Sequence, residues 1–541
     1  MNLTVGMVDK EEISPSVASD LRSPELPSAG KQLFFSVLRA LFIFLISLIW
    51  FGAFAPLGLD FHHDGVMFIP ALRVAAGQTV FRDVFCQYGL LSPLLQGGAV
   101  WLGGGELLAM KYLSVLFYAA IGVLLDFLWR PLLSARWRNL ILLMFWVLMP
   151  DTMVTFHAWS SIFALFFSLL ALLFILKFFD GKRWYFAGAA GVAAGLTFLA
   201  RHPVGVVTSL ALLIALFFEI MLDLPGKLRA RRLIKNCVWV ACGMLVTVVS
   251  AGIYLFCTGA WHDFVLQCWK FVLNFVHGRG GRGSWSYFAE SLFPFTTDLG
   301  LWDSIFGLLP IAAMAWLFIG VRRAAADKSV LKENLMICTL SIFALGAWHQ
   351  YYPVPCVRHL FWAGVPFFGF WVLSFQKLWF AKECYRAVCR MAALLLVIVF
   401  LAAGFIRINA AVNRLIESPR RAVAAVPGLR GMKLTTAENR MISGVRSLFD
   451  SLPEHIRKRG VLNCTTDGLW SVLLPESDFS HPQFIWMKET VYPDYDVKLD
   501  RYIRQFRPVV LYNKPLYLEN YFPAAAWQYM GEIYTFAVPL E

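Results

Sequence analysis

The stretch 60-DFHHDGVMFIPALRVAAGQTVFRDVFCQYGLLSP-93 decides how this chain is interpreted, because it brings charged groups to the edge of a membrane. It follows the first long apolar run, residues 33–57. Its ionisable residues include Asp60, His62, His63, Asp64, Arg82 and Asp83. Ionisable groups at a membrane boundary are costly to desolvate, so such a cluster predicts a functional site.

The composition predicts a polytopic membrane protein. Of the 541 residues, 59% are hydrophobic and only 15% are charged, whereas soluble domains carry about 25% charge. The net charge of +13 does not indicate nucleic-acid binding, because the basic residues lie in short loops between apolar runs, as Lys and Arg do in cytoplasmic loops. The ten cysteines form no CxxC pair, so neither a disulfide framework nor a zinc site is expected.

The apolar runs predict about eleven spans, since a span needs about 20 apolar residues. They cover residues 33–56, 107–129, 139–156, 159–178, 184–200, 203–222, 236–257, 301–320, 333–350, 357–375 and 391–408. The Gly-rich run 89–103 is interpreted as a juxtamembrane or re-entrant helix, because a span there would move the basic loop 130–138 outside. The charge pattern then places the N-terminus in the cytoplasm.

These boundaries divide the chain into three parts. Residues 1–32 are polar, lack a cleavable-signal pattern and predict a disordered cytoplasmic tail. Residues 33–408 form the membrane domain, with outer loops at 57–106 and 258–300. Residues 409–541 contain turn signals and short apolar strands, and predict a small extracytoplasmic α/β domain that can bury its own core.

Two carboxylates in the first outer loop predict acid–base chemistry. Asp60 and Asp64 are four residues apart and would share one face of a helix. Apolar surroundings raise the pKa of a carboxyl group, which suits a general base that takes a proton from a hydroxyl. His62 and His63 could bind a metal or a phosphate, or cap a turn. Alternatively, the whole cluster is a solvated loop that anchors the first span.

Basic residues on the same face form a rim around this acidic centre. They are Arg201, His202, Lys270, His277, Arg279, Arg282, Arg358 and His359. Arginine matches phosphate oxygens with a planar fork of donors, so the rim suits a phosphate leaving group. The alternative is anchoring to lipid headgroups. Arg82 and Asp83 are either a local ion pair or contacts to a sugar or phosphate.

Two outer corners add further candidates. Asp151 follows Met149 and Pro150 where the third span reaches the surface, and is either a second acid of the site or a polar end-cap. The ninth span closes with the segment 348-WHQYYP-353, which contains His349 and Tyr351. Tyr and His at this depth are either binding residues or ordinary members of the interfacial aromatic belt.

Together these motifs resemble the GT-C glycosyltransferases that use polyprenyl-phosphate sugars, among them bacterial aminoarabinose and protein O-mannosyl transferases. The resemblance rests on D-x-x-x-D-G from Asp60, followed by an apolar-Pro-Ala step and A-x-G-Q-x-x-F-R-D-x-F at 75–85. The family places an acidic pair after the first span, whereas here His63 precedes Asp64. Either Asp60 or Asp64 therefore remains the candidate catalytic group. The resemblance covers residues 33–375.

The resemblance implies transfer of a sugar from a polyprenyl-phosphate donor to a glycan, lipid or protein of the cell envelope. The reaction would occur on the extracytoplasmic face of a bacterial inner membrane, with inversion, and with Asp64 or Asp60 as base. Arg201 would face the lipid phosphate, since 191-GVAAGLTFLAR-201 is similar to a family span that ends in such a basic residue. Some relatives need a divalent cation, so Mg or Mn could bind at Asp60, His62 and Asp64.

The expected substrate-binding set combines these motifs. It comprises His63, Arg82, Asp83, Gln87, Tyr88, Asp151, His157, Arg201, His202, Arg279, Arg282, His349, Tyr351, Arg358 and His359.

Two other function classes remain open. A transporter or flippase for lipid-linked saccharides predicts charges within the spans and paired broken helices, but Lys111, Asp126 and Lys270 lie near span ends or loops. A non-catalytic envelope assembly protein predicts that Asp60 and Asp64 can be replaced without effect.

Overall fold

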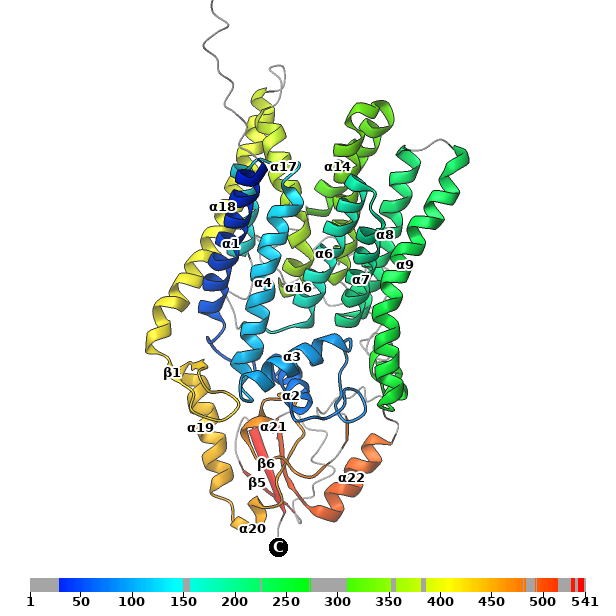
Figure 1. Cartoon of the computed structure of the whole chain (residues 1–541). Helices are drawn as coiled ribbons and strands as arrows, with labels where there is room; N and C mark the ends of the chain where they lie inside the picture. The colour runs from blue at the N-terminus through cyan, green and yellow to red at the C-terminus, as the bar shows by residue number, and fades with distance from the viewer. Residues whose placement is uncertain are drawn as a thin grey trace, which may run out of the picture.

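A bundle of long helices with a small α/β domain at one end makes up the molecule (Figure 1). A computed structural model describes residues 29–148, 156–223, 226–271, 273, 309–351, 357–380, 386–479, 481–482, 492, 494–513, 527–530 and 534–539. The bundle holds α1 (Ala29–Phe54), α4 (Leu107–Trp129), α5 (Ala135–Leu148), α6 (Ser160–Gly181), α7 (Trp184–Ala200), α8 (His202–Asp223), α9 (Gly226–Cys257), α14 (Leu309–Ala326), α15 (Leu331–Ala347), α16 (Val357–Gly364), α17 (Phe368–Trp379) and α18 (Arg386–Glu417).

Each predicted span overlaps one or two of these helices, and the chain is a polytopic helical membrane protein. Residues 149–155 and 301–308 of the predicted spans lie outside the described residues. Among the described residues, seven helices are long and apolar enough to cross a membrane, and α7 is a shorter apolar helix. The predicted spans 107–129 and 184–200 match α4 and α7 to the residue. The predicted span 357–375 is divided into α16 and α17 by the 3-10 turn η8 (Val365–Phe367), which contains Pro366. Proline supplies no N–H for a continuous helix.

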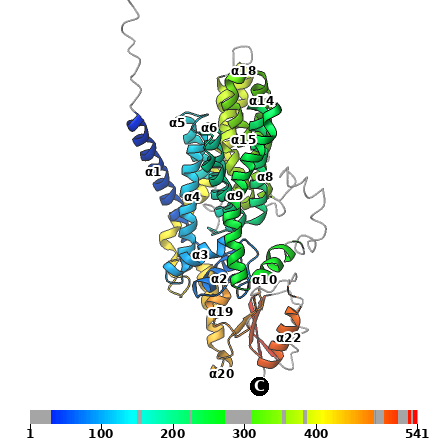
Figure 2. The same cartoon turned by 45° about the vertical axis from the view of Figure 1, so that its right-hand side comes forward.

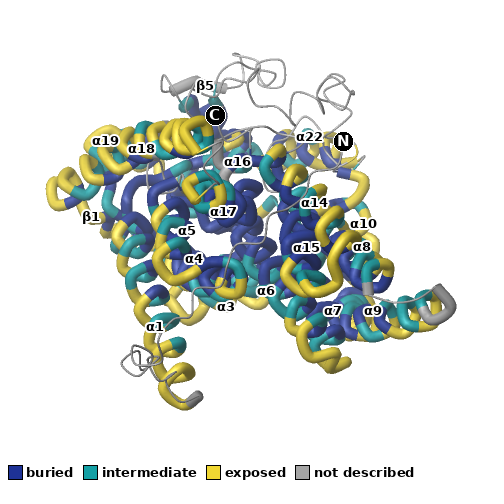
Figure 3. Tube along the Cα trace, turned by 90° about the horizontal axis from the view of Figure 1, so that it is seen from above, coloured by how far each residue is buried: buried dark blue, intermediate teal, exposed yellow. Residues whose placement is uncertain are grey.

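Small residues bring the bundle helices together. A Cβ on Gly191 of α7 would lie 2.0 Å from the carbonyl oxygen of Val240 in α9. Such close backbone approach is the usual way in which helices associate within lipid. Viewed along the bundle, buried residues fill its middle while α1 and α18 expose much of their surface at its edge (Figure 3). The exposed side chains of α1 include Leu33, Phe42 and Ile49, as expected for lipid contact.

Two short helices, α2 (His63–Ala75) and α3 (Leu91–Leu102), lie where the bundle meets the α/β domain (Figures 1 and 2). At 12 residues, α3 is about 18 Å long and too short for a hydrocarbon core of about 30 Å. This agrees with the prediction of a juxtamembrane or re-entrant helix at 89–103. The described part of the second outer loop begins with α10 (Trp261–Val265) and the π-helical turn η3 (Leu266–Lys270).

The C-terminal domain is built around a four-stranded sheet of order β3-β4-β6-β5. Its strands are β3 (Val461–Asn463), β4 (Val509–Asn513), β5 (Trp527–Met530) and β6 (Tyr534–Pro539). β3 and β4 are parallel, and the other pairs are antiparallel. The helices are α19 (Thr436–Asp450), α20 (Glu454–Arg457), α21 (Trp470–Leu473) and α22 (Tyr495–Phe506), and a short ribbon pairs β1 (Ala422–Val423) with β2 (Lys433–Leu434). The predicted α/β character is confirmed.

Hydrogen bonds of both backbone and side-chain groups join the domain to the first outer loop. The amide of Lys433 donates to the carbonyl of Pro56 at 2.6 Å, and the amide of Leu469 donates to that of Phe61 at 3.2 Å. The buried amide of Gln267 accepts from the N–H of Cys86 and donates to the hydroxyl of Tyr492. The first outer loop and the C-terminal domain therefore lie at one end of the bundle, opposite the start of α1 (Figures 1 and 2).

Candidate functional site

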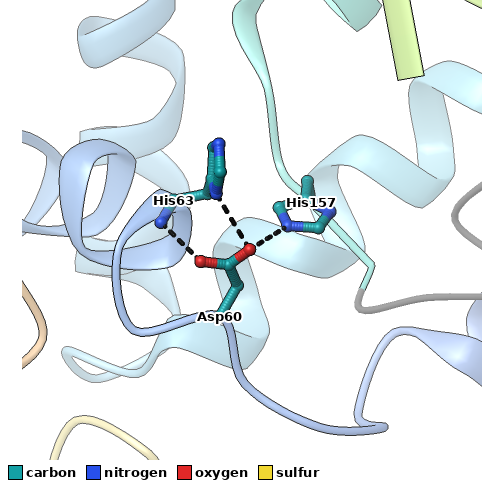
Figure 4. A group of neighbouring side chains, drawn as sticks. All are labelled: Asp60, His63 and His157. Carbon is teal, nitrogen blue, oxygen red and sulfur yellow. Dashed lines mark hydrogen bonds and ion pairs between the residues drawn. The ribbon is translucent and has the colours of Figure 1, made fainter. Parts of the chain in front are cut away.

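Asp60, His63 and His157 meet where α2 and α6 begin. Asp60 follows α1, His63 is the first residue of α2, and His157 precedes α6. The Oδ2 atom of Asp60 lies 2.9 Å from His63 Nδ1 and 3.0 Å from His157 Nε2 (Figure 4). Its Oδ1 atom accepts the backbone N–H of His63 at 2.8 Å, at the start of the helix. The cluster therefore joins two segments nearly a hundred residues apart in the chain.

The surroundings of Asp60 favour its ionised form, and its side chain has some access to solvent. Burial alone would raise the pKa of its carboxyl group, but hydrogen bonds from His157 and His63 lower that pKa well below its usual range. The expectation of a raised pKa is therefore wrong for Asp60, because two imidazoles stabilise the charged form. The Asp60 side chain is 20% exposed and that of His63 35%, whereas His157 is buried. The side chains of Asp60 and His63 are therefore both partly accessible to solvent.

These three residues could also hold a divalent cation. Their possible ligand atoms all lie within 4.8 Å of one another. Two imidazole nitrogens and one carboxylate suit Mn or Zn better than Mg, which prefers oxygen ligands in an octahedron. Of the ligands expected from the sequence, this group contains Asp60 but neither His62 nor Asp64.

The structure places His62 and Asp64 in other roles. His62 Nδ1 lies 2.6 Å from the carbonyl oxygen of Thr466 in the C-terminal domain. Asp64 is 1% exposed, and its Oδ2 atom pairs with the ammonium of Lys111 at 2.9 Å. Reasoning from the sequence treated Lys111 only as a charge near a span end. A single lysine within an apolar span, opposite an acidic loop, was the signal for this pair.

A chain of rings connects the Asp60 cluster to Arg201. The ring of Trp159 lies 5.4 Å from that of His63 and 5.3 Å from that of Tyr88. The Arg201 guanidinium lies over the Tyr88 ring at 5.9 Å and donates to the hydroxyl of Ser161 at the start of α6. Arg201, expected to face a lipid phosphate, is therefore linked to the acidic centre through the rings of Tyr88 and Trp159.

Other predicted residues lie around this core. His202 is buried against Phe198 and Phe264. His349 belongs to the 3-10 turn η7 (Trp348–Tyr351) and interacts electrostatically with Arg201. In the same turn, Tyr351 is fully buried. The ring of His359 in α16 contacts Trp362, and Arg358 falls in the same helix. Asp151, Arg279 and Arg282 lie outside the described residues.

Arg82 and Asp83 form a local ion pair, which was one of the two interpretations of this dipeptide. The guanidinium donates to both Asp83 oxygens, at 2.9 and 2.8 Å, and to the carbonyl of Thr258 after α9. Asp83 in turn accepts the backbone N–H of Thr79. Nearby, the amide of Gln87 donates to the Tyr88 hydroxyl at 2.9 Å. These contacts fix the shape of the loop that carries Tyr88.

The C-terminal domain forms one wall of the site through the loop between β3 and α21. The backbone at Gly65 in α2 touches the backbone at Gly468 so closely that a Cβ on Gly65 would lie 2.4 Å from the Leu469 nitrogen. In the same loop, Asp467 accepts a hydrogen bond from the Tyr534 hydroxyl of β6 at 2.8 Å. This wall could not be foreseen from side-chain motifs, because most of its contacts are made by backbone.

Two solved structures are similar to this chain over nearly its whole length. ArnT from Cupriavidus metallidurans bound to undecaprenyl phosphate has 14% sequence identity and a TM-score of 0.53, with 94% of this chain and 98% of that chain covered. Its apo state has 13% identity, the same coverage and a TM-score of 0.51. No protein-family model and no curated protein sequence matches. The predicted resemblance is thus confirmed at the level of the fold: this chain has a fold similar to that of ArnT.

Proposed function

We propose that the chain is a glycosyltransferase that moves a sugar from a polyprenyl-phosphate donor to a hydroxyl of an acceptor. The observation that carries this proposal is the ionised Asp60, held between His63 and His157 where the membrane helices meet the C-terminal domain. The GT-C fold supports it, and the ArnT structure with bound undecaprenyl phosphate supports a lipid-phosphate donor.

In the proposed reaction, the acceptor oxygen attacks the anomeric carbon as the bond between that carbon and the phosphate oxygen breaks. The bonding electrons leave with the lipid phosphate. The hydroxyl proton passes to the Asp60 carboxylate late in the displacement, once the attacking oxygen carries positive charge and is acidic enough for a carboxylate of low pKa. A single displacement of this kind inverts the anomeric centre. We assign the base to Asp60 rather than Asp64, because Asp64 is sealed against Lys111 and is 1% exposed.

Arg201 is the proposed partner of the departing phosphate. Its guanidinium can add charge-assisted hydrogen bonds to phosphate oxygens, and Ser161 and Tyr88 hold it in place. The rings of Trp159 and Tyr88 lie between Arg201 and His63, where a sugar ring can pack on them. If a divalent cation binds at Asp60, His63 and His157, it supplies positive charge beside the phosphate.

The remaining expectations belong to this proposal as well. The acceptor is an envelope glycan, lipid or protein, and the reaction takes place at the extracytoplasmic face of a bacterial inner membrane. The start of α1 then faces the cytoplasm, because it lies at the opposite end of the bundle from α2 (Figure 2).

The experiment is transfer of radiolabelled sugar from a pool of polyprenyl-phosphate sugars to envelope fractions by membranes that contain the protein. Wild type should label one fraction, Asp60→Asn should lose labelling, and Asp500→Asn, at an exposed carboxylate of α22, should match wild type. Equal labelling by Asp60→Asn would remove Asp60 from the mechanism. Failure of wild type to label any fraction would favour transport or assembly.

A further inference from the structure

A buried ion pair lies directly behind Asp60. Lys111, in the second turn of α4, is 0% exposed, and its ammonium lies 2.9 Å from Oδ2 of Asp64, which is 1% exposed. Within the described part of the chain, Oδ1 of Asp64 has no hydrogen-bond partner. Burying two charges is costly, and apolar residues of similar volume often stabilise a protein at least as well. Stability alone therefore explains this pair poorly.

The pair is connected to Asp60 through the backbone. The same Oδ2 atom that contacts Lys111 accepts the N–H of Asp60 at 3.1 Å. The N–H of Asp64 donates to the carbonyl of Asp60 at 2.9 Å. Both backbone groups of Asp60 are thus held by Asp64, and its side chain is held by His63 and His157.

We propose that Asp64 is a positioning residue for Asp60. Asp64 accepts the N–H of Asp60, and this contact sets the direction in which the Asp60 carboxylate leaves the backbone. Lys111 compensates the buried charge of the Asp64 carboxylate. The inference rests on the proposed function, because it gives Asp60 the reacting role. It also gives different roles to Asp60 and Asp64, which the sequence left as equal candidates for the catalytic base.

Direct chemical roles for the pair fit the structure less well. A general base must reach the hydroxyl from which it takes a proton, and Asp64 is 1% exposed. A lysine that binds phosphate must reach the phosphate, and Lys111 is 0% exposed. What the pair does reach is the start of α2, where Asp60 and His63 are anchored.

Two double variants separate positioning from charge. One variant, the asparagine pair, combines Asp64→Asn with Lys111→Met. The other, the leucine pair, combines Asp64→Leu with Lys111→Met. Both variants remove the two charges, so neither leaves an unpaired buried ion. Asparagine still accepts the Asp60 N–H through its carbonyl oxygen, whereas leucine cannot. Because small displacements of reacting groups can cost about 100-fold in rate, the leucine pair should lose about 100-fold in kcat with little change in KM. The asparagine pair should stay within about threefold of wild type.

Hydrogen–deuterium exchange of residues 57–66 gives a second readout that does not depend on sugar transfer. The leucine pair should exchange faster there, while the asparagine pair keeps the wild-type protection. This result holds even if wild type transfers no sugar, so a failure of the proposed function is distinguishable from a failure of this inference.

Several outcomes would overturn the proposal. A folded but inactive asparagine pair means that the Asp64 carboxylate itself reacts. Wild-type activity and protection in both pairs mean that Asp64 does not position Asp60. If the leucine pair does not fold, the asparagine pair still decides, since a loss of either kcat or protection in that variant contradicts the role assigned to the Asp60 N–H.

Discussion

Replacing Gly65 with alanine should push the loop of the C-terminal domain that carries Gly468 away from α2. The new Cβ would lie 2.4 Å from the Leu469 nitrogen and 2.6 Å from the Cα of Gly468. Both are backbone atoms, so no side-chain rotation can relieve the contact. Ordinary van der Waals contact begins at 3.4 Å, so the two backbones must move apart by about 1 Å.

A displacement of this size is enough to break the contacts that join α2 to the domain. The distance of 2.6 Å between His62 Nδ1 and the Thr466 carbonyl would open to about 3.6 Å, which is no longer a hydrogen bond. Overpacking of this kind costs about 1–3 kcal/mol. Because His62 precedes the cluster residue His63, we expect transfer to fall by about 100-fold.

The assay is sugar transfer by purified protein in lipid nanodiscs, with the thermal midpoint measured in parallel. The matched control is Gly98→Ala in α3, where a Cβ meets no atom within 4 Å; it should keep full activity. Gly468→Ala should be intermediate, since its nearest contact would be 3.0 Å. Wild-type transfer by a folded Gly65→Ala variant would refute the conclusion that the domain completes the site.

Three further predictions follow from the site and the domain. Arg201→Gln should lower transfer by about 10–100-fold, and Arg201→Lys should restore only part of it, because lysine lacks the planar fork; initial rates with purified donor measure this. Elemental analysis should find a transition metal in wild type and less in His157→Ala, and equal contents would argue against a metal site. Burial and the charge of Lys498 lower the pKa of His481 to about 4. The unfolded chain, with a pKa near 6.5, then binds the extra proton, so stability should fall between about pH 6.5 and 4; His481→Gln should flatten this part of the thermal-midpoint profile.

The sequence predicted the membrane helices well because each is a long apolar run that ends at charges, glycine or proline. α4 and α7 match their predictions to the residue for this reason. Hydropathy does not predict contacts between distant segments. His157 was only one of the expected substrate-binding residues, and its hydrogen bond to Asp60 spans 97 residues.

The sequence also did not predict which role each of the two carboxylates, Asp60 and Asp64, takes. The spacing of Asp60 and Asp64 suggested two acids on one helical face, but α2 begins at His63, after Asp60. Asp60 therefore turns toward the imidazoles, and Asp64 turns into the bundle toward Lys111. Asp64 is the buried carboxylate because α4 places Lys111 against it, and no local sequence motif predicts the position of α4.

The three residues His63, Asp64 and Gly65 thus act as one unit in which each faces a different neighbour. His63 contacts the Asp60 carboxylate, Asp64 contacts the membrane helix α4 through Lys111, and Gly65 touches the backbone of the C-terminal domain. One helical turn therefore connects the proposed base to both halves of the molecule. Asp64→Leu with Lys111→Met and Gly65→Ala should each lower transfer by displacing Asp60, so their losses should be less than additive when the changes are combined. Independent effects would mean that the bundle and the domain act on the substrate by separate routes.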